Sequence, residues 1–420
     1  MLATKRLPLR TVVSTARLFA TESVSSSTTD SLPPPSFNNP PKSQPTRLYP
    51  RPRSAVLDTQ KPLQSLPSTF GRNQLLPVSS STRALLESIV AQFDAPIRYA
   101  FAYGSGVFEQ DGYTTKETGE KPMLDFMFAV THASHWHSIN MHQNPSHYPL
   151  HARTFGSSYV SRIEELGPGV WFNAYVPMNG VTIKYGVTTV DNLCSDLLNW
   201  NSLYLAGRMH KPLRIIKDDA RVRLTQQVNL TSAVRTALLT LPPSFPENEL
   251  FERITSISYL GDPRMILPAE NRNKVANIVS RQGSQFRELY YRLVVGLPGV
   301  RWRVGEGVIE QEDTAKARAA HLRKLPRNLL DRLKSKYVGL PEDESTYWVQ
   351  MAEDEKLPQT LMQGMYATFQ MAFKLIYRTE ISGIVRYPAT IQSLKGLATA
   401  GLGKSLRYSA AKISKWRKSS

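Results

Sequence analysis

The chain has 420 residues, a length that suggests two or three domains. Its 52 Lys and Arg residues against 34 Asp and Glu give a net charge of +18, which favours polyanionic partners: nucleic acid, anionic lipid or a nucleoside triphosphate. The single cysteine, Cys194, excludes an intramolecular disulfide and a cysteine-based zinc site, and we interpret it as a buried apolar side chain. No run of about 20 apolar residues predicts a membrane span.

The first 22 residues have the composition of a mitochondrial presequence. They are rich in basic and hydroxyl residues and contain no acid before Glu22. A disordered basic arm is the alternative interpretation. Residues 23–81 are rich in Ser, Pro, Thr and Asn, and cannot bury enough apolar surface to fold. We therefore predict a disordered linker there.

Residues 82–219 mix helical and strand patterns, which predicts an α/β (α+β) domain. In chain order, the expected elements are a helix over 82–94, a strand leading to the glycines at 104–106, a buried strand over 123–131, a helix over 158–166, two strands about a Met-Asn-Gly turn within 170–189, and a helix over 191–205. Residues 220–300 show mostly helical periodicity and are expected to form a smaller second domain. Residues 301–380 are expected to form an insertion, extended and polar up to 358, and connecting helices.

A Gly-Ser-Gly turn follows the first apolar strand, at Gly104, Ser105 and Gly106. Glycines at such a turn let backbone N–H groups close on a phosphate, and the serine hydroxyl adds another donor. The turn is not a Walker motif, because no Gly-Lys-Ser/Thr follows, and it is not GxGxxG. It is a candidate phosphate-binding turn, with a purely structural turn as the alternative.

Asp125 interrupts the second apolar strand. A carboxylate at such a position is unfavourable unless it is paired or binds a metal. A strand, a Gly-Ser turn and a second strand carrying an acid is the arrangement of the nucleotidyltransferase superfamily, in which acids hold Mg²⁺ against the triphosphate. Those enzymes usually carry a second acid where this chain has Met127. Glu109, Asp219 and Asp262 are the candidates to complete the metal site.

Basic residues supply the charge that a triphosphate needs. Lys184 alternates with Ile183 and Tyr185, so it faces away from that apolar pair and either contacts a phosphate or lies in solvent. Three more cations follow the predicted helix over 191–205, which contains Trp200. As a group they are expected to line the path of the phosphates: Arg208, Lys211 and Lys217.

Two further polar clusters are open to interpretation. Asp262 and Arg264 lie in a Gly-Asp-Pro-Arg turn, where the acid is either catalytic or only initiates the turn. Four histidines at 135, 137, 142 and 147 lack the spacing of a zinc site. We expect structural hydrogen bonding around Asn140 and Asn144, or contact with a nucleoside base.

The C-terminal residues 381–420 contain no acid. Eight basic residues are interleaved with apolar ones such as Leu394 and Trp416, which predicts a basic amphipathic helix at an anionic membrane surface. Gly396, Gly401 and Gly403 lower its intrinsic helicity, so the helix is expected to form on lipid. A disordered basic tail is the alternative.

Several long stretches resemble one family, the mitochondrial translocator assembly and maintenance proteins, which are peripheral phosphatidate cytidylyltransferases. The stretches are YAFAYGSGVFEQ (99–110), HWHSINMHQNPSHY (135–148), GPGVWFNAYV (167–176), IKYGV (183–187), WNSLYLAGRMHKPLRIIKDD (200–219), YLGDPRM (259–265) and ENRNKVANIV (270–279). They follow the family's order and cover most of 97–280, and residues 391–416 resemble its ending. The segments 23–80 and 300–358 have no counterpart that we can assign.

The resemblance implies a nucleotidyltransferase-fold domain (82–219), a smaller winged-helix-like domain (220–300) and an active site between them. It implies that CTP and phosphatidic acid give CDP-diacylglycerol and pyrophosphate on the matrix side of the mitochondrial inner membrane, for cardiolipin synthesis. The expected cofactor is Mg²⁺, and the expected partners are CTP, phosphatidic acid and an anionic lipid surface, with neither nucleic acid nor zinc. The expected catalytic residues are Asp125 (also the metal ligand), Lys184, Asp219 and Asp262, and the expected nucleotide-binding residues are Gly104, Ser105, Gly106, Tyr185, Arg208, Lys211 and Lys217.

Two other functions compete with this one. The positive charge suits a nucleotidyltransferase that acts on RNA, but no RNA-binding motif or basic-aromatic stacking pattern is present. The family's name also suggests a non-enzymatic assembly factor for protein import into the inner membrane. The glycine turn together with Asp125 favours an enzyme over both.

Overall fold

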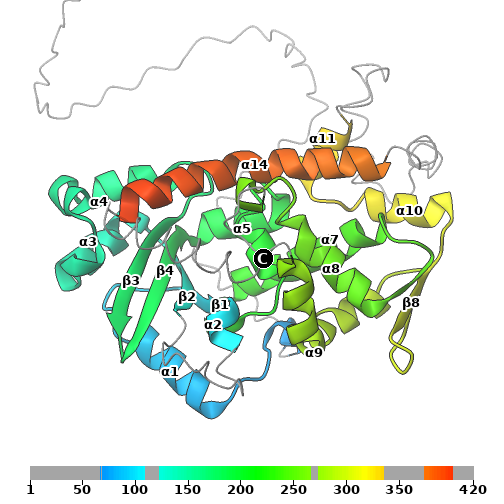
Figure 1. Ribbon diagram of the computed structural model, residues 1–420, viewed down its shortest axis with the longest axis horizontal. Helices are drawn as coiled ribbons and strands as arrows, with labels where there is room; N and C mark the ends of the chain where they lie inside the picture. The colour runs from blue at the N-terminus through cyan, green and yellow to red at the C-terminus, as the bar shows by residue number, and fades with distance from the viewer. Residues whose placement is uncertain (1–66, 68, 109–122, 266–272, 335–372, 401–420) are drawn as a thin grey trace, which may run out of the picture. The chain divides into compact units, whose positions relative to one another are not determined.

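The structure is a computed structural model and describes residues 67, 69–108, 123–265, 273–334 and 373–400 (Figure 1). The predicted presequence, most of the predicted linker, Glu109 and the last 20 residues of the predicted membrane tail lie outside the described residues. Helices and strands alternate through the described part, so the predicted mixed α/β class is confirmed.

A five-stranded mixed sheet forms the centre of the first half, in the order β3-β4-β2-β1-β5. Its strands are β1 (Tyr99–Tyr103), β2 (Leu124–Val130), β3 (Trp171–Met178), β4 (Val181–Thr189) and β5 (Arg214–Lys217). The central pair β2–β4 is parallel and every other neighbouring pair is antiparallel. The predicted hairpin joins β3 to β4, and its Asn179 and Gly180 both have positive φ, as a tight hairpin turn requires.

Alternation along the strands sends side chains to two different cores. In β1, Tyr99 and Phe101 join one core with helices α5 (Val190–Asn199) and α7 (Ala220–Leu238). Ala100 and Ala102 join the other core with α1 (Ser80–Val90) and with Trp136 of α3 (Ala133–Gln143). The sheet is therefore covered by helices on both faces.

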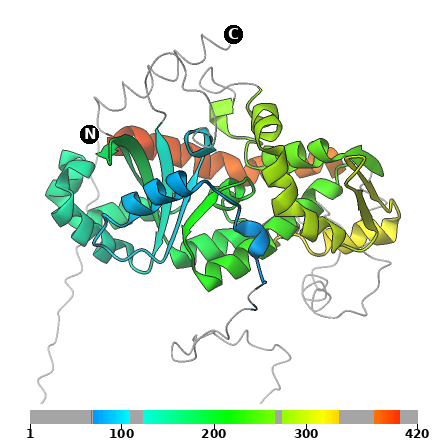
Figure 2. The ribbon, with the colours of Figure 1, turned by 90° about the horizontal axis from the view of Figure 1, so that it is seen from below.

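The second half packs three helices against a small sheet (Figure 2). The helices are α7, α8 (Glu247–Ile257) and α9 (Lys274–Val295), and the antiparallel strands, in the order β6-β8-β7, are β6 (Ser244–Pro246), β7 (Val300–Arg303) and β8 (Val308–Gln311). Stacked rings of Phe251 and Phe286, 5.2 Å apart between centroids, pack beside Trp302 of β7. Residues 300–311, which we expected in an insertion, thus belong to the core of the second half. Strands of four residues are too short to give a clear periodicity in sequence.

Two short helices follow the small sheet, α10 (Ala315–Leu322) and α11 (Arg327–Lys334). The remaining elements are α4 (Leu150–Glu165), the short helices α2 (Ser105–Phe108) and α6 (Ala206–Met209), and the 3₁₀ turns η1 (Arg72–Gln74), η2 (Pro145–His147) and η3 (Pro263–Met265). None of the described helices is both long enough and apolar enough to cross a membrane.

Part of the predicted linker is folded, because η1 lies within it. The side chain of Asn73 donates to the backbone oxygen of Leu289 at 2.8 Å, and Gln74 donates to that of Arg223 at 3.0 Å. Side-chain amides, rather than apolar burial, attach this segment to α7 and α9. Composition could not reveal it.

Helix α14 (Phe373–Ala400) lies across both halves, from α11 to β3 (Figure 1). Ile381, Ile384 and Val385 are fully buried in the main core, whereas Leu394 is exposed. The part of the predicted membrane tail between 381 and 396 is therefore packed against the protein. The remainder, 401–420, lies outside the described residues.

Candidate active site

Three polar side chains form a row across adjacent strands at one end of the large sheet. The strand register pairs Tyr103 of β1 with Asp125 of β2, and Asp125 with Lys184 of β4. All three point to the face that α5 and α7 cover, because they share the parity of Phe101 and Met127, which lie in that core. Lys184 Nζ lies 3.6 Å from Asp125 Oδ1, and both side chains are about one-quarter exposed, at 22% and 28%.

The glycine turn leads directly out of this row. Gly104 has φ of 88°, and a Cβ there would lie 3.4 Å from Asp125 Oδ2. A Cβ on Gly106 would lie 2.5 Å from the backbone oxygen of Met123, so any side chain there would force the backbone to shift. Ser105 begins α2 between them. Only glycine fits at 106, so the turn lies close against the strand that carries Asp125.

Arg208 lies over the aromatic rings beside this row. Its guanidinium is 3.7 Å from the ring centroid of Tyr204 and 5.9 Å from that of Tyr103. Burial opposes its charge, but Tyr204 and Tyr103 outweigh that effect and raise the pKa of Arg208. Burial also raises the pKa of Tyr103, with Asp125 acting in the same direction and Arg208 and Lys184 against it. Tyr103 is thus the centre of the cluster.

Lys211 continues the basic surface away from the sheet. Its ammonium donates to the backbone oxygen of Gly207 and to Ser258 Oγ, the latter at 3.0 Å. Lys211 and Lys274 approach the ring of Tyr259 to 5.0 and 5.1 Å. Burial, then Arg208 and Lys274, lower the pKa of Lys211 well below its usual value. Such crowding of like charges favours an anionic ligand.

The Asp262–Arg264 turn closes the other side of the cluster. Arg264 Nε lies 2.9 and 3.1 Å from the two oxygens of Asp262, whose side chain is only 3% exposed. Burial would raise the pKa of Asp262, but the hydrogen bonds and charge of Arg264, together with Arg208, lower it. Asp262 is thus an ionised acid already bound to Arg264, which it orients.

Two of the predicted site residues lie at the opposite end of the sheet. Lys217 pairs with Ala100, near the start of β1, whereas Asp125 pairs with Tyr103 at its end. Asp219 follows Lys217, caps α7 by accepting from the backbone N–H of Arg221 at 3.0 Å, and pairs with Arg98. The ends of β1 are roughly 13 Å apart at the usual rise. The structure therefore does not bring Lys217 or Asp219 to the site.

Tyr185 lies on the wrong face of the sheet for a nucleotide bound beside Lys184. It is fully buried in the core with α1 and α3. Its hydroxyl accepts a hydrogen bond from Asn140 Nδ2 and contacts His147 Nδ1, both at 2.9 Å. The alternation that turns Lys184 toward the site turns Tyr185 away from it.

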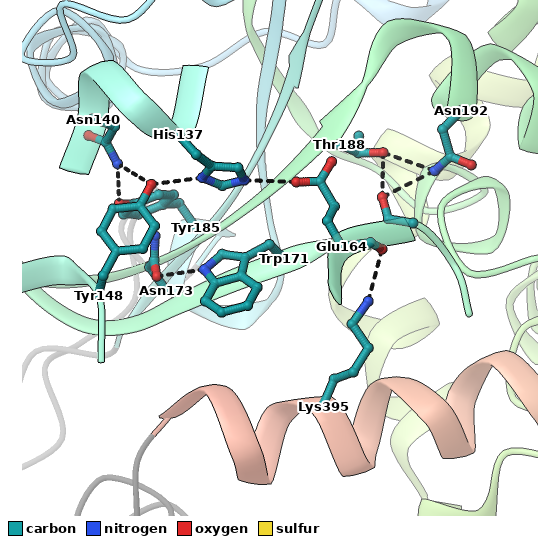
Figure 3. Close-up of polar contacts among 11 residues, drawn as sticks. His137, Asn140, Tyr148, Glu164, Trp171, Asn173, Tyr185, Thr188, Asn192 and Lys395 are labelled. Carbon is teal, nitrogen blue, oxygen red and sulfur yellow. Dashed lines mark hydrogen bonds and ion pairs between the residues drawn. The ribbon is translucent and has the colours of Figure 1, made fainter. Parts of the chain in front are cut away.

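Tyr185 belongs to a buried network of polar side chains (Figure 3). His137 contacts the Tyr148 hydroxyl with Nδ1 and Glu164 Oε2 with Nε2, each at 2.8 Å. Asn140 Nδ2 bridges the hydroxyls of Tyr148 and Tyr185 at 2.9 Å each. The expected structural hydrogen bonding around Asn140 and Asn144 is confirmed, with Asn144 donating to Asn140 Oδ1 at 3.0 Å.

Carboxylates are scarce around the row. Met127 is fully buried in the core, where Gly186 leaves room for its side chain. Among the described residues, no three His, Cys, Asp or Glu side chains are grouped closely enough to hold a metal ion. Asp125 is thus the acid of the row whose side chain is partly exposed, whereas Asp262 is already bound to Arg264.

A groove of about 690 Å³ lies beside the Asp262–Arg264 turn. It is lined by Leu260 and Gly261 and, from α14, by residues that include Arg378, Arg386 and Tyr387. The cluster and the groove together combine two acids (Asp125 and the Arg264-bound Asp262), several cations and a glycine turn, a set suited to a polyphosphate and a second anionic substrate. Sequence analysis missed Tyr103 and Lys274. The position of Tyr103, two residues after Phe101 and next to Gly104, could have indicated it.

Comparison with known proteins identifies a family. A family model described as phosphatidate cytidylyltransferase, mitochondrial, matches residues 86–415. Relatives with that name include one from Schizosaccharomyces pombe, 37% identical over 358 residues, covering 82% of this chain and 86% of the relative. One from Xenopus laevis is 36% identical over 349 residues and covers 82% and 98%. One from Danio rerio is 37% identical over 349 residues and covers 81% and 97%.

Proposed function

Because the chain belongs to the mitochondrial phosphatidate cytidylyltransferase family, we propose that the cluster around Tyr103, Asp125 and Lys184 is its active site. The enzyme is a nucleotidyltransferase that converts CTP and phosphatidate to CDP-diacylglycerol and pyrophosphate. A phosphate oxygen of phosphatidate forms a bond to the α-phosphorus of CTP, and the bond from that phosphorus to the bridging oxygen breaks. The electron pair leaves with pyrophosphate.

The observation that carries this assignment is the row itself, next to a turn that only glycine can form. Phosphatidate is already an anionic nucleophile, so the protein mainly binds, aligns and neutralises charge. The backbone of Gly104–Gly106 binds the triphosphate, Asp125 lies next to this turn, and Lys184 lies on the other side of Asp125. Arg208 and Arg264, the latter held by Asp262, stabilise the negative charge that develops on the leaving pyrophosphate.

Mg²⁺ is the proposed cofactor, with Asp125 as its protein ligand. Magnesium sites of this kind use one or two carboxylates, with substrate phosphates and water as the other ligands. Asp125 fits, since its side chain is partly exposed and borders the turn at Gly104. Bound there, the ion would neutralise charge on the phosphates and orient them.

We propose a nucleotidyltransferase fold for the first half and a winged-helix-like arrangement for the second. The mixed sheet with a glycine turn after β1 and an acid on β2 supports the former. Three helices with a small antiparallel sheet support the latter. The site then lies where the two halves adjoin, because Asp125 comes from one and Arg264 from the other.

We also propose a location on the matrix side of the mitochondrial inner membrane, with the product used for cardiolipin synthesis. The relatives are named mitochondrial. Residues 401–420 carry Lys404, Arg407 and further cations that suit an anionic lipid surface. The groove that borders Gly261 supports an approach for phosphatidate, since Arg378 and Arg386 line it.

One assay tests the function against both rivals. Purified protein is incubated with Mg²⁺ and CTP labelled at the α-phosphate, with either phosphatidate liposomes or RNA. We expect label in the lipid fraction and none in RNA. Label in RNA would indicate an RNA-directed enzyme, and no transfer to either acceptor would favour a non-enzymatic assembly factor.

A further inference from the structure

Helix α14 touches both halves of the molecule, and at two places a glycine of one half lies directly against it. This inference rests on the proposed function, because that function defines which residues form the active site. The contacts themselves do not depend on it. The first contact is at Gly261, immediately before Asp262. A Cβ on Gly261 would lie 2.2 Å from Ser382 Oγ and 2.6 Å from the Ser382 backbone oxygen. The turn that carries Asp262 and Arg264 is thus pressed against α14.

The second contact is at Gly167, in the loop between α4 and β3. A Cβ there would lie 2.7 Å from Ile391 Cγ2. One turn further along α14, Lys395 is only 6% exposed and donates to the backbone oxygens of Glu164 at 3.0 Å and Leu166 at 2.8 Å (Figure 3). These carbonyls end α4, so a buried cation satisfies them. This contact fixes α14 to the half that carries Asp125 and Lys184.

Between the two contacts, α14 is a continuous part of the main core. Ile384, Val385 and Ala389 are at most 5% exposed and belong to the same cluster as Met127 and Phe172, which lie beside Asp125 and Lys184 on the sheet. Ser382 and Ile391 are nine residues apart, about 13 Å along a helix. Pro388 lies between them and cannot donate the helical backbone hydrogen bond. The close packing of the buried side chains, rather than an unbroken series of hydrogen bonds, therefore transmits a displacement from one end to the other.

We propose that α14 is a positioning strap: it holds the Asp262–Arg264 turn at a fixed place relative to the Asp125–Lys184 strand pair. Its residues act through Arg264 and touch no substrate in this role. The helix contacts both of the halves that supply residues to the proposed site. It also connects the site directly to the tail that follows residue 400.

The test loosens the contact far from Arg264 and measures the effect at Arg264. Gly167→Ala inserts a Cβ against Ile391. Gly180→Ala is the matched control, because Gly180 also has positive φ (72° against 66°) but has open space where the Cβ would lie. The two variants share the backbone strain, and only the first displaces α14.

Activity is measured with a soluble, short-chain phosphatidate, so that membrane binding plays no part. We expect kcat of Gly167→Ala to fall on the order of tenfold, the scale of a small misplacement of a catalytic group. The KM for CTP should change little, since the Gly104 turn and Asp125 are undisturbed. Adding Ile391→Ala removes the nearest contact and should restore much of kcat, while Gly180→Ala should match the wild type.

Hydrogen exchange gives a readout that does not need turnover. In Gly167→Ala, the amide of Met265, which donates to the Asp262 backbone oxygen at 3.0 Å, should exchange faster, whereas Gly180→Ala should leave it protected. Should Gly167→Ala fail to fold, Lys395→Met loosens the same end and carries both measurements. Faster exchange confined to the α4–β3 loop, or an unchanged kcat, would overturn the strap. A wild-type protein without transferase activity but with the expected exchange pattern would refute the proposed function alone.

Discussion

Two polar clusters lie on opposite faces of the same sheet, and adjacent residues of β4 belong to them. Lys184 points into the site cluster with Tyr103, Asp125 and Arg208, whereas Tyr185 points into the buried network of His137 and Asn140. In the network, each of these side chains is bonded to another and almost none is exposed. In the site cluster, the side chains remain partly exposed and positive charges gather around one acid.

This difference separates structure from function better than residue type does. Both clusters contain tyrosine, acids and cationic or potentially cationic groups. Buried polar groups that satisfy one another hold a fold together, because leaving any of them unpaired is unfavourable. Groups of like charge that converge at an accessible edge destabilise the protein unless a ligand neutralises them. A strongly shifted pKa in such a cluster, as for Lys211, then indicates a functional site.

The largest expected effect sharpens the contrast between two acids. Asp125→Asn should lower kcat by more than about 100-fold, because it removes the charge that the proposed site needs, with little change in Tm since Asp125 is partly exposed. Asp219→Ala should do the reverse: it removes a helix cap and lowers stability by about 1 kcal/mol, with normal turnover. The rate of pyrophosphate release measures kcat and thermal unfolding measures stability, for each of the two variants. A fully active Asp125→Asn would refute the role of this residue.

The next largest effect compares two glycines in helices. Gly106→Ala places a Cβ 2.5 Å from the Met123 backbone oxygen, which must displace the phosphate turn, and should lower kcat/KM for CTP on the order of tenfold or more. Gly283→Ala in α9 meets nothing within 4 Å and should leave kinetics unchanged while raising stability by about 0.5–1 kcal/mol. If both variants bind CTP normally, the turn is only structural.

A smaller effect concerns the protonation of Lys211. Burial, Arg208 and Lys274 lower its pKa in the free protein, so a rising pH removes its positive charge well before that of an ordinary lysine. A bound triphosphate favours the charged form, so CTP affinity should weaken as the pH rises through this pKa, by up to about tenfold. Titration calorimetry over an alkaline series measures it. Lys211→Arg should abolish this pH dependence. If the variant shows the same pH profile as the wild type, the dependence comes from another group.

The smallest effect on catalysis is expected in the buried network. Tyr185→Phe removes a hydroxyl shared by Asn140 and His147, and should lower the free energy of unfolding by about 1–3 kcal/mol. The kcat and KM of the folded fraction should stay unchanged. Tyr103→Phe is the paired variant on the site face, where activity should fall and stability should change less. A raised KM for CTP in Tyr185→Phe would instead indicate that Tyr185 contributes to nucleotide binding.

Features that depend on neighbouring residues could be predicted from the sequence. The apolar runs of β1 and β2 predicted buried strands, and the Met-Asn-Gly turn predicted the β3–β4 hairpin, because side-chain periodicity and turn chemistry are local properties. Long matching stretches also indicated the family. Gly104, Gly106 and Asp125 could be chosen for the same reason, since each stands out within its own segment.

Which distant residues meet depends on the fold. Lys217 ends β5, which is antiparallel to β1, and Asp219 follows it, so the strand register carries both to the far end of the sheet. Arg264 and Lys274, much later in the chain, instead come close to Arg208 and Lys211. The same holds for Lys395, a cation suited by sequence to a membrane surface that instead lies buried against the end of α4. Strand register and helix packing are long-range properties, and neither composition nor periodicity encodes them in a form that can be read locally.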